Sequence, residues 1–386
     1  MTTKLTTSLR QRIGFLDGLR GLAALYVMLG HARWLLWEGF SESFVHHPER
    51  YSLFGKIGAY ASLSLYYGHQ AVIFFFVLSG FVIHLRYSQA ILENKTTATF
   101  DLIPFFIRRL WRIYPVFLFA MLLTLVLDHV GMSQNYAIYF HTTPYNLINL
   151  NVIPNYTLQT GLANLTLLPV APYWGSNSPV WSLRYEWCFY LIYPLFWLMT
   201  RYSLKLASAV VFMLFLMSLM GWLGPVGLVE IILSAFPAWW LGALLADVYT
   251  GRLKLRFARI AWLSGLFVIL PFLVTPLVNI EQTLQDLLWA LGFTGLIAAC
   301  LAWQNRGGSL AYLERLHFWG NISYDLYVIH FPILVFMGGW LMSQSPDHTL
   351  PQEFTWIFIG AAVCVGAAYI THRLVERPFM KTRSAP

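Results

Sequence analysis

Charged residues are scarce in this chain of 386 residues, since only 11% are charged and 58% are hydrophobic. Soluble globular domains carry about 25% charged residues. A chain so poor in charge cannot cover itself with polar surface, which excludes an ordinary soluble domain. Cysteine is scarce too: Cys188, Cys300 and Cys364 lie in apolar segments, without a CxxC pair or a Cys/His cluster. This pattern excludes a disulfide framework, and we expect no metal site.

Long apolar runs are what the sequence does contain. Crossing the hydrocarbon core of a bilayer takes about 20 helical residues. Backbone groups in lipid must be hydrogen-bonded within the protein, which favours helices. We therefore predict an all-α integral membrane protein with about ten transmembrane helices. The predicted spans are 15–37, 70–92, 112–130, 183–200, 206–223, 229–249, 260–278, 285–303, 319–342 and 354–374.

Basic residues are distributed unevenly among the segments that join these spans. With a cytoplasmic N-terminus, the outer loops hold only Arg50 and Lys56, and the inner segments hold most of the other basic residues. The positive-inside rule therefore predicts cytoplasmic N- and C-termini. Because topology explains the net charge of +8, that charge does not indicate a nucleic-acid partner. The partner that we expect around the chain is the lipid bilayer.

Ionisable residues inside apolar segments indicate function, because each costs about 2.5 kcal/mol or more in lipid and usually faces the bundle interior. Arg20 and His31 in the first span are eleven residues apart. This is close to three helical turns, so both project from one face, about 16 Å apart. A histidine at this depth can accept a proton from a hydroxyl near neutral pH, which is general-base chemistry. The alternative is a hydrogen bond between helices, but the pairing with Arg20 favours catalysis.

Three other motifs have a catalytic and a structural interpretation. The cluster Arg108, Arg109 and Arg112 in FFIRRLWRIYP could clamp phosphates, although by itself it favours anchoring to anionic lipid. Glu186 in PVWSLRYEWCFYLIYP could orient a catalytic histidine or bind a sugar hydroxyl, or it could pair with another helix.

The third motif, ISYDLYVIHFP, places Tyr327 and His330 on one helix face because they are three residues apart. Packing of polar groups that satisfy each other is the favoured interpretation of this pair. The long outer loops, roughly 38–69 and 131–182, are rich in aromatic residues that could stack on sugar rings. An interfacial aromatic belt is the alternative for those residues.

Five motifs occur in order along the chain: FLDGLRGLAALYVMLGH, FFFVLSGFVI, RRLWRIYP, PVWSLRYEWCFYLIYP and ISYDLYVIHFP. Together they resemble the acyltransferase-3 family of bacterial membrane acyltransferases, over about residues 13–378. The resemblance implies a ten-helix core that takes an acyl group, commonly acetyl from acetyl-CoA, on the cytoplasmic side. It implies a carbohydrate hydroxyl at or beyond the outer face of the cytoplasmic (inner) membrane as the acceptor.

The resemblance also assigns roles to residues. Its Arg-x10-His motif and its recurrent glutamate imply three catalytic residues: Arg20, His31 and Glu186. Its Arg-x-x-Arg motif implies that acyl-CoA phosphates bind Arg109 and Arg112, with Arg108 beside them. The substrate-binding residues that we expect are Trp181, Tyr327 and His330. The chain departs from the family where Trp187 and Cys188 follow Glu186, since relatives usually have a second acidic or amide residue there.

We expect residues 1–386 to form a single domain with no appended soluble domain, which acts alone or with a separate extracytoplasmic acyltransferase. The predicted function is O-acyl transfer, most simply O-acetylation, to a carbohydrate such as lipopolysaccharide O-antigen or an exopolysaccharide. His31 then acts as a general base or carries the acyl group itself. The alternative is a secondary transporter or an export subunit for a sugar or an anion, because intramembrane charges would serve it equally well. Transporters often consist of repeated halves, and the sequence shows no such duplication.

Overall fold

The computed structural model describes residues 13–93, 100–222, 227–274 and 281–381, and the regular structure within these ranges is helical throughout. The long helices are α2 (Phe15–Leu35), α4 (Gly68–Glu93), α5 (Leu102–Ser133), α8 (Trp181–Tyr202), α9 (Leu204–Leu219), α10 (Gly227–Thr250), α11 (Phe257–Val274), α12 (Gln282–Asn305), α14 (His317–Ser343) and α15 (Thr355–Thr371). The shorter α-helices are α3 (Leu53–Ser62), α6 (Asn146–Asn151), α7 (Leu158–Leu165), α13 (Ala311–Glu314) and α16 (Arg377–Lys381), and π-helical turns lie at Phe40–Phe44 and His372–Glu376.

Each of the ten predicted spans coincides with one of the long helices. The ends of the spans predicted at 206–223 and 260–278 lie partly outside the described residues, as do both chain termini. Five described stretches are long and apolar enough to cross a membrane: Leu53–Glu93, Leu102–Ser133, Gln282–Asn305, His317–Ser343 and Thr355–Met380. Two shorter helices are also apolar, Leu204–Leu219 and Phe257–Phe267. The all-helical, membrane-embedded character is therefore confirmed, and the count of ten spans and the position of the termini stay predictions.

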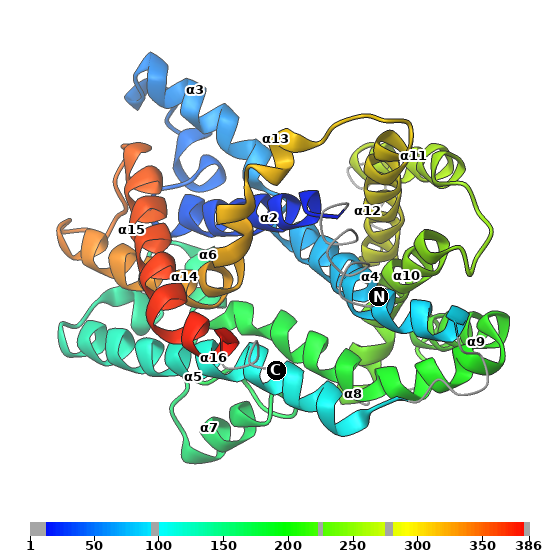
Figure 1. Cartoon of the computed structure of the whole chain (residues 1–386). Coiled ribbons are helices and arrows are strands. Elements are labelled where there is room, and N and C mark those ends of the chain that lie inside the picture. Colours follow the sequence, from blue (N-terminus) through cyan, green and yellow to red (C-terminus); the bar gives the residue numbers. More distant parts are fainter. Residues whose placement is uncertain (1–12, 94–99, 223–226, 275–280, 382–386) are drawn as a thin grey trace.

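Helix α2 lies at the centre of the arrangement, between α14 and α4 (Figure 1). One hydrophobic cluster is built mainly from α4, α8, α10 and α12, and a second from α2, α14, α15 and the segment 137–152. Phe75, Tyr324 and Tyr327 pack against both clusters. These three side chains mark the boundary at which the candidate site lies.

Glycines allow the central helices to approach closely. A methyl group at Gly80 of α4 would overlap the Trp239 carbonyl of α10, and one at Gly242 would overlap the backbone of α4. Gly21 of α2 and Gly320 of α14 meet the backbone of each other's helix in the same way. Small residues at helix crossings are typical of membrane bundles, where packing and interhelical hydrogen bonds drive association because lipid is as apolar as the side chains.

The segment between α5 and α8 is held onto the bundle by buried polar contacts. Asp128 of α5, which is fully buried, accepts hydrogen bonds from the backbone N–H (2.8 Å) and the hydroxyl (2.7 Å) of Ser176. Pro332 has no N–H, so it leaves the Val328 carbonyl of α14 without its helical donor. The Asn177 side chain donates to that carbonyl at 2.9 Å. The segment thereby reaches α14 close to His330.

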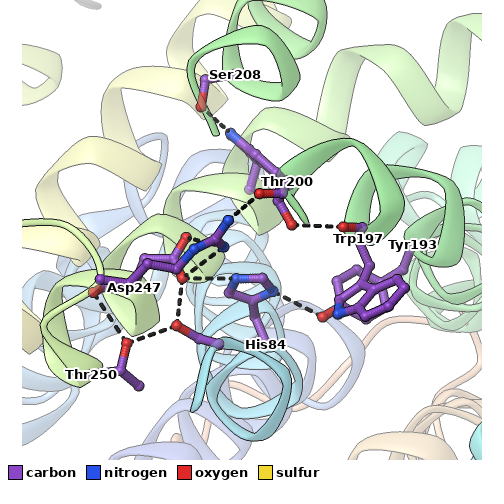
Figure 2. Close-up of polar contacts among 10 residues, drawn as sticks. His84, Tyr193, Trp197, Thr200, Ser208, Asp247 and Thr250 are labelled. Carbon is purple, nitrogen blue, oxygen red and sulfur yellow. Dashed lines mark hydrogen bonds and ion pairs between the residues drawn. The ribbon is translucent and has the colours of Figure 1, made fainter. Parts of the chain in front are cut away.

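A second buried network joins α4, α8 and α10 (Figure 2). His84 lies between Tyr193 and Asp247, with Nδ1 2.8 Å from the tyrosine hydroxyl and Nε2 3.1 Å from the carboxylate. Arg252 lies 3.3 Å from both oxygens of Asp247 and donates to the Thr200 carbonyl. His84 and Asp247 are fully buried. The arginine compensates the buried carboxylate, so this network holds three helices together.

Candidate functional site

A cavity of about 180 Å³ lies among α2, α4, α5, α8 and α14. Its lining on α4 runs from Val72 to Ile83, which at the rise of an α-helix is a length of about 16 Å. Helices α2 and α14 start near one end of it, and α4 and α8 start near the other. Its polar lining comes from Asp17, Arg20, Ser79, Arg109, Arg112, Ser182, Glu186, Tyr190, Ser323, Tyr324 and Tyr327. Five predicted site residues from four helices thus share one cavity: Arg20, Arg109, Arg112, Glu186 and Tyr327.

Arg20 is held against α14 at the cavity wall. Its Nε donates to the Ser323 hydroxyl at 3.0 Å and its Nη2 to the Gly320 carbonyl at 2.7 Å. Asp17, one turn earlier in α2, forms an ion pair with it at 3.2 Å. The close crossing of α2 and α14 makes these contacts, so the guanidinium is oriented before any ligand binds.

The two arginines of the Arg-x-x-Arg motif differ in their partners. Arg112 is paired with Glu376, which is 2% exposed, at 2.7 Å. Arg109 stacks on the rings of Phe105 and Tyr190, and the structure records no anionic partner for it among the described residues. Arg108 does not line the cavity and lies 3.4 Å from the Tyr87 hydroxyl. Of the three, Arg109 has the positive charge that is most available to an anion entering the cavity.

Glu186 faces the cavity from α8. One of its oxygens accepts hydrogen bonds from the hydroxyls of Ser79, at 2.7 Å, and Tyr190. Arg184, two residues earlier, turns away and donates to backbone carbonyls of the segment between α5 and α8. Sequence reasoning missed Ser79 and Tyr190, although Tyr190 follows Glu186 by four residues and therefore lies on the same helix face.

His31 and His330 form a hydrogen-bonded pair next to the cavity. Nδ1 of His31 lies 2.8 Å from Nε2 of His330, and the two rings stack with centroids 5.0 Å apart. Nδ1 of His330 lies 3.0 Å from the Leu326 carbonyl oxygen. His330 is fully buried, whereas His31 keeps part of its surface exposed. His330 follows the cavity-lining Tyr327 by one turn, which places the pair just beyond the cavity wall.

The remaining predicted residues divide between the cavity and its surroundings. Tyr327 lines the cavity, and its hydroxyl lies 2.6 Å from that of Ser182. Trp181 does not line it and stacks on His69 with ring centroids 5.4 Å apart. His69 in turn lies 2.9 Å from an Asp286 oxygen. Sequence reasoning missed this histidine–aspartate pair, because the two residues are 217 positions apart.

Asp325, His372 and Glu376 place ligand-type atoms within 4.8 Å of one another. His372 lies 2.6 Å from one Glu376 oxygen, and Arg112 lies 2.7 Å from the other. The arginine already supplies the positive charge that a metal ion would bring to these carboxylates. This donor set fits a charge-compensated network better than a metal centre, and the absence of a metal cofactor stays a prediction.

Comparisons with known proteins agree with this geometry. The family model described as Acyltransferase domain (Acyl_transf_3) matches residues 13–373, which includes every helix that lines the cavity. The chain is 26% identical over 347 residues to acyltransferase MdmB of Streptomyces mycarofaciens, with 81% of each chain covered. No solved structure matches the chain.

Proposed function

The chain belongs to the Acyltransferase domain family, which makes it a membrane acyltransferase, and from this premise we propose that it transfers an acyl group from acyl-CoA to a carbohydrate hydroxyl. Acetyl-CoA is the proposed donor, and a cell-surface or exported glycan such as O-antigen or exopolysaccharide is the proposed acceptor. The observation that carries the proposal is the cavity lined by three arginines, Glu186 and Tyr327, since Tyr327 lies one helical turn before His330, which contacts His31.

The proposed topology is ten transmembrane helices in one domain, with both termini on the cytoplasmic side of the bacterial inner membrane. A helix at each of the ten predicted positions supports it. In this orientation α2 and α14 start at the cytoplasmic face, so the arginines belong to the inner half of the cavity. The starts of α4 and α8, with Trp181 and Ser182, belong to the outer half. A cavity about 16 Å long would let donor and acceptor approach from opposite sides.

The donor is proposed to bind at the inner half. Its phosphates contact Arg109 first, because that guanidinium has no recorded anionic partner in the described structure. Arg20 adds a second positive charge whose orientation is fixed by α14. Arg112 contributes less net charge because Glu376 pairs with it, and Arg108 acts at the entrance. Guanidinium groups suit this task because they bind phosphates with two parallel hydrogen bonds.

His31 is proposed to carry the chemistry, by either of two routes. As a general base it takes the proton of the acceptor hydroxyl, the oxygen attacks the thioester carbon, and the CoA thiolate leaves and is protonated. As a nucleophile it attacks the thioester itself, releases CoA and passes the acyl group from its ring nitrogen to the hydroxyl. Glu186 and Tyr327, with Trp181 further out, are proposed to position the acceptor.

Inverted membrane vesicles with radiolabelled acetyl-CoA test this function. Vesicles that contain the native chain should transfer label to glycan, and His31→Ala should abolish the transfer at equal protein level. His129→Ala is the matched control, because His129 lies on α5 outside the cavity and is exposed. Transfer by the His31 variant would refute the catalytic role. Absence of CoA-dependent transfer by the native chain, with acceptor supplied, would favour the transporter alternative.

A further inference from the structure

The two histidines beside the cavity have a fixed order of donors and acceptors. A carbonyl oxygen only accepts hydrogen bonds, so the 3.0 Å contact with Leu326 requires a proton on Nδ1 of His330. In neutral His330 the other nitrogen, Nε2, is then an acceptor. The 2.8 Å contact therefore requires that Nδ1 of His31 donates to it. Neutral His31 is left with its lone pair on Nε2.

The reverse order would require a doubly protonated His330. Its Nδ1 proton is committed to the Leu326 carbonyl, so a second proton on Nε2 would make the ring a cation. His330 is fully buried, and the structure records no carboxylate in contact with it among the described residues. A buried charge without a counter-charge is strongly unfavourable, which excludes that order.

We propose that His330 is a positioning residue that holds His31 in the tautomer with Nε2 free to accept a proton or attack an acyl carbon. This inference rests on the proposed catalytic role of His31. It changes the expected role of His330 from substrate binding to orientation of the catalytic ring. The wrong tautomer would present an N–H to the reaction and remove the lone pair that either catalytic route needs.

The packing around His31 fixes the ring as well as the proton. His330 stacks on one face of it at an interplanar angle of 21°, and Phe331 and Trp34 meet it edge-on with centroids 5.1 and 5.9 Å away. Beside these residues, the Asn177 side chain donates to the Val328 carbonyl of α14 and replaces the helical hydrogen bond that Pro332 cannot make. A neutral histidine can serve as the orienting partner here without burying a carboxylate in the bundle.

Two substitutions separate the two hydrogen bonds of His330. In His330→Gln the side-chain oxygen can occupy the position of Nε2 and accept from His31. In His330→Asn the shorter amide can still donate to Leu326 but does not reach His31. Both variants keep a polar side chain of similar size. His129→Asn is the matched control, because His129 makes the same contact with the carbonyl four residues earlier, at 2.9 Å, but lies outside the site.

The experiment measures kcat and the KM for acetyl-CoA of each variant. It also determines the tautomer of His31 by ¹⁵N NMR of histidine-labelled protein in nanodiscs. The His31 signal is assigned by its absence from the spectrum of His31→Ala. We expect His330→Asn to lower kcat about 10²-fold or more, within the range of a positioned general base, with KM little changed. His330→Gln should retain kcat within about tenfold of the native value. In the native protein the His31 proton should be on Nδ1, and His330→Asn should shift it toward Nε2.

Equal activities of the Gln and Asn variants would overturn the proposal, as would a native His31 that has its proton on Nε2. Loss of activity in both variants would also contradict it, because the acceptor that Gln supplies would then be insufficient. Failure of the proposed function would give a different result. His31→Ala would retain transfer although native His31 had its proton on Nδ1.

Discussion

Arg109 and Arg112 line the same cavity three residues apart, yet we expect different consequences when each is replaced by alanine. Arg109 has only aromatic contacts in the described structure, so its charge is available to the donor. Arg112 is committed to Glu376 at 2.7 Å. We therefore expect Arg109→Ala to weaken donor binding and Arg112→Ala mainly to weaken folding.

The magnitudes follow from these partners. A hydrogen bond to a charged group contributes about 1.5–3 kcal/mol. At about 1.4 kcal/mol per factor of ten, loss of one such bond should raise the KM for acetyl-CoA about 10- to 150-fold in Arg109→Ala. Removal of one partner of a buried ion pair costs about 3–5 kcal/mol. Arg112 is 29% exposed, which places the cost of Arg112→Ala toward or below the lower end of that range.

The assay compares initial rates over a range of acetyl-CoA concentrations with thermal unfolding of the same purified samples. Arg109→Lys is the matched control, because it retains the charge but loses the two-pronged donor geometry, and its KM should lie between the native and alanine values. A larger rise in KM for Arg112→Ala than for Arg109→Ala would refute this division of roles. So would an unchanged unfolding temperature in Arg112→Ala.

Two further predictions concern the bundle. Asp247→Asn removes the buried counter-charge of Arg252 and should destabilise the protein by about 3 kcal/mol or more. Activity per folded molecule should be retained. An unchanged unfolding temperature would contradict the role of this network. Gly80→Val places a branched side chain against the Trp239 carbonyl and should sharply reduce the yield of folded protein, whereas Gly265→Val, at a position with open space around it, should not. Equal yields of the two valine variants would disprove the close crossing.

The sequence predicts which site residues share a helix face, but not which residues of distant helices pair with each other. The eleven-residue spacing predicts that Arg20 and His31 share a face of α2, and in the structure both contact α14. The same periodicity could have identified Tyr190 from Glu186. Such spacings follow from the pitch of a single helix, which the sequence alone determines.

The partners of these residues come from packing between distant segments. His31 and His330 are 299 positions apart, and Arg112 and Glu376 are 264 apart. Neither pair could be identified from one sequence, because a helix periodicity gives the face of a residue but not the helix that it meets. This limit explains why the sequence alone does not show that His330 contacts His31 or that Arg112 pairs with Glu376.

The most direct test of the account uses the purified protein in nanodiscs with acetyl-CoA labelled on the acetyl group and a glycan acceptor. With the native protein and with His129→Ala, one CoA thiol should be released for each labelled acetyl group transferred to the glycan. In His31→Ala both the release and the transfer should be lost. Label transfer by the His31 variant at the native rate, or a native protein that transfers no acyl group from CoA, would contradict the central claim.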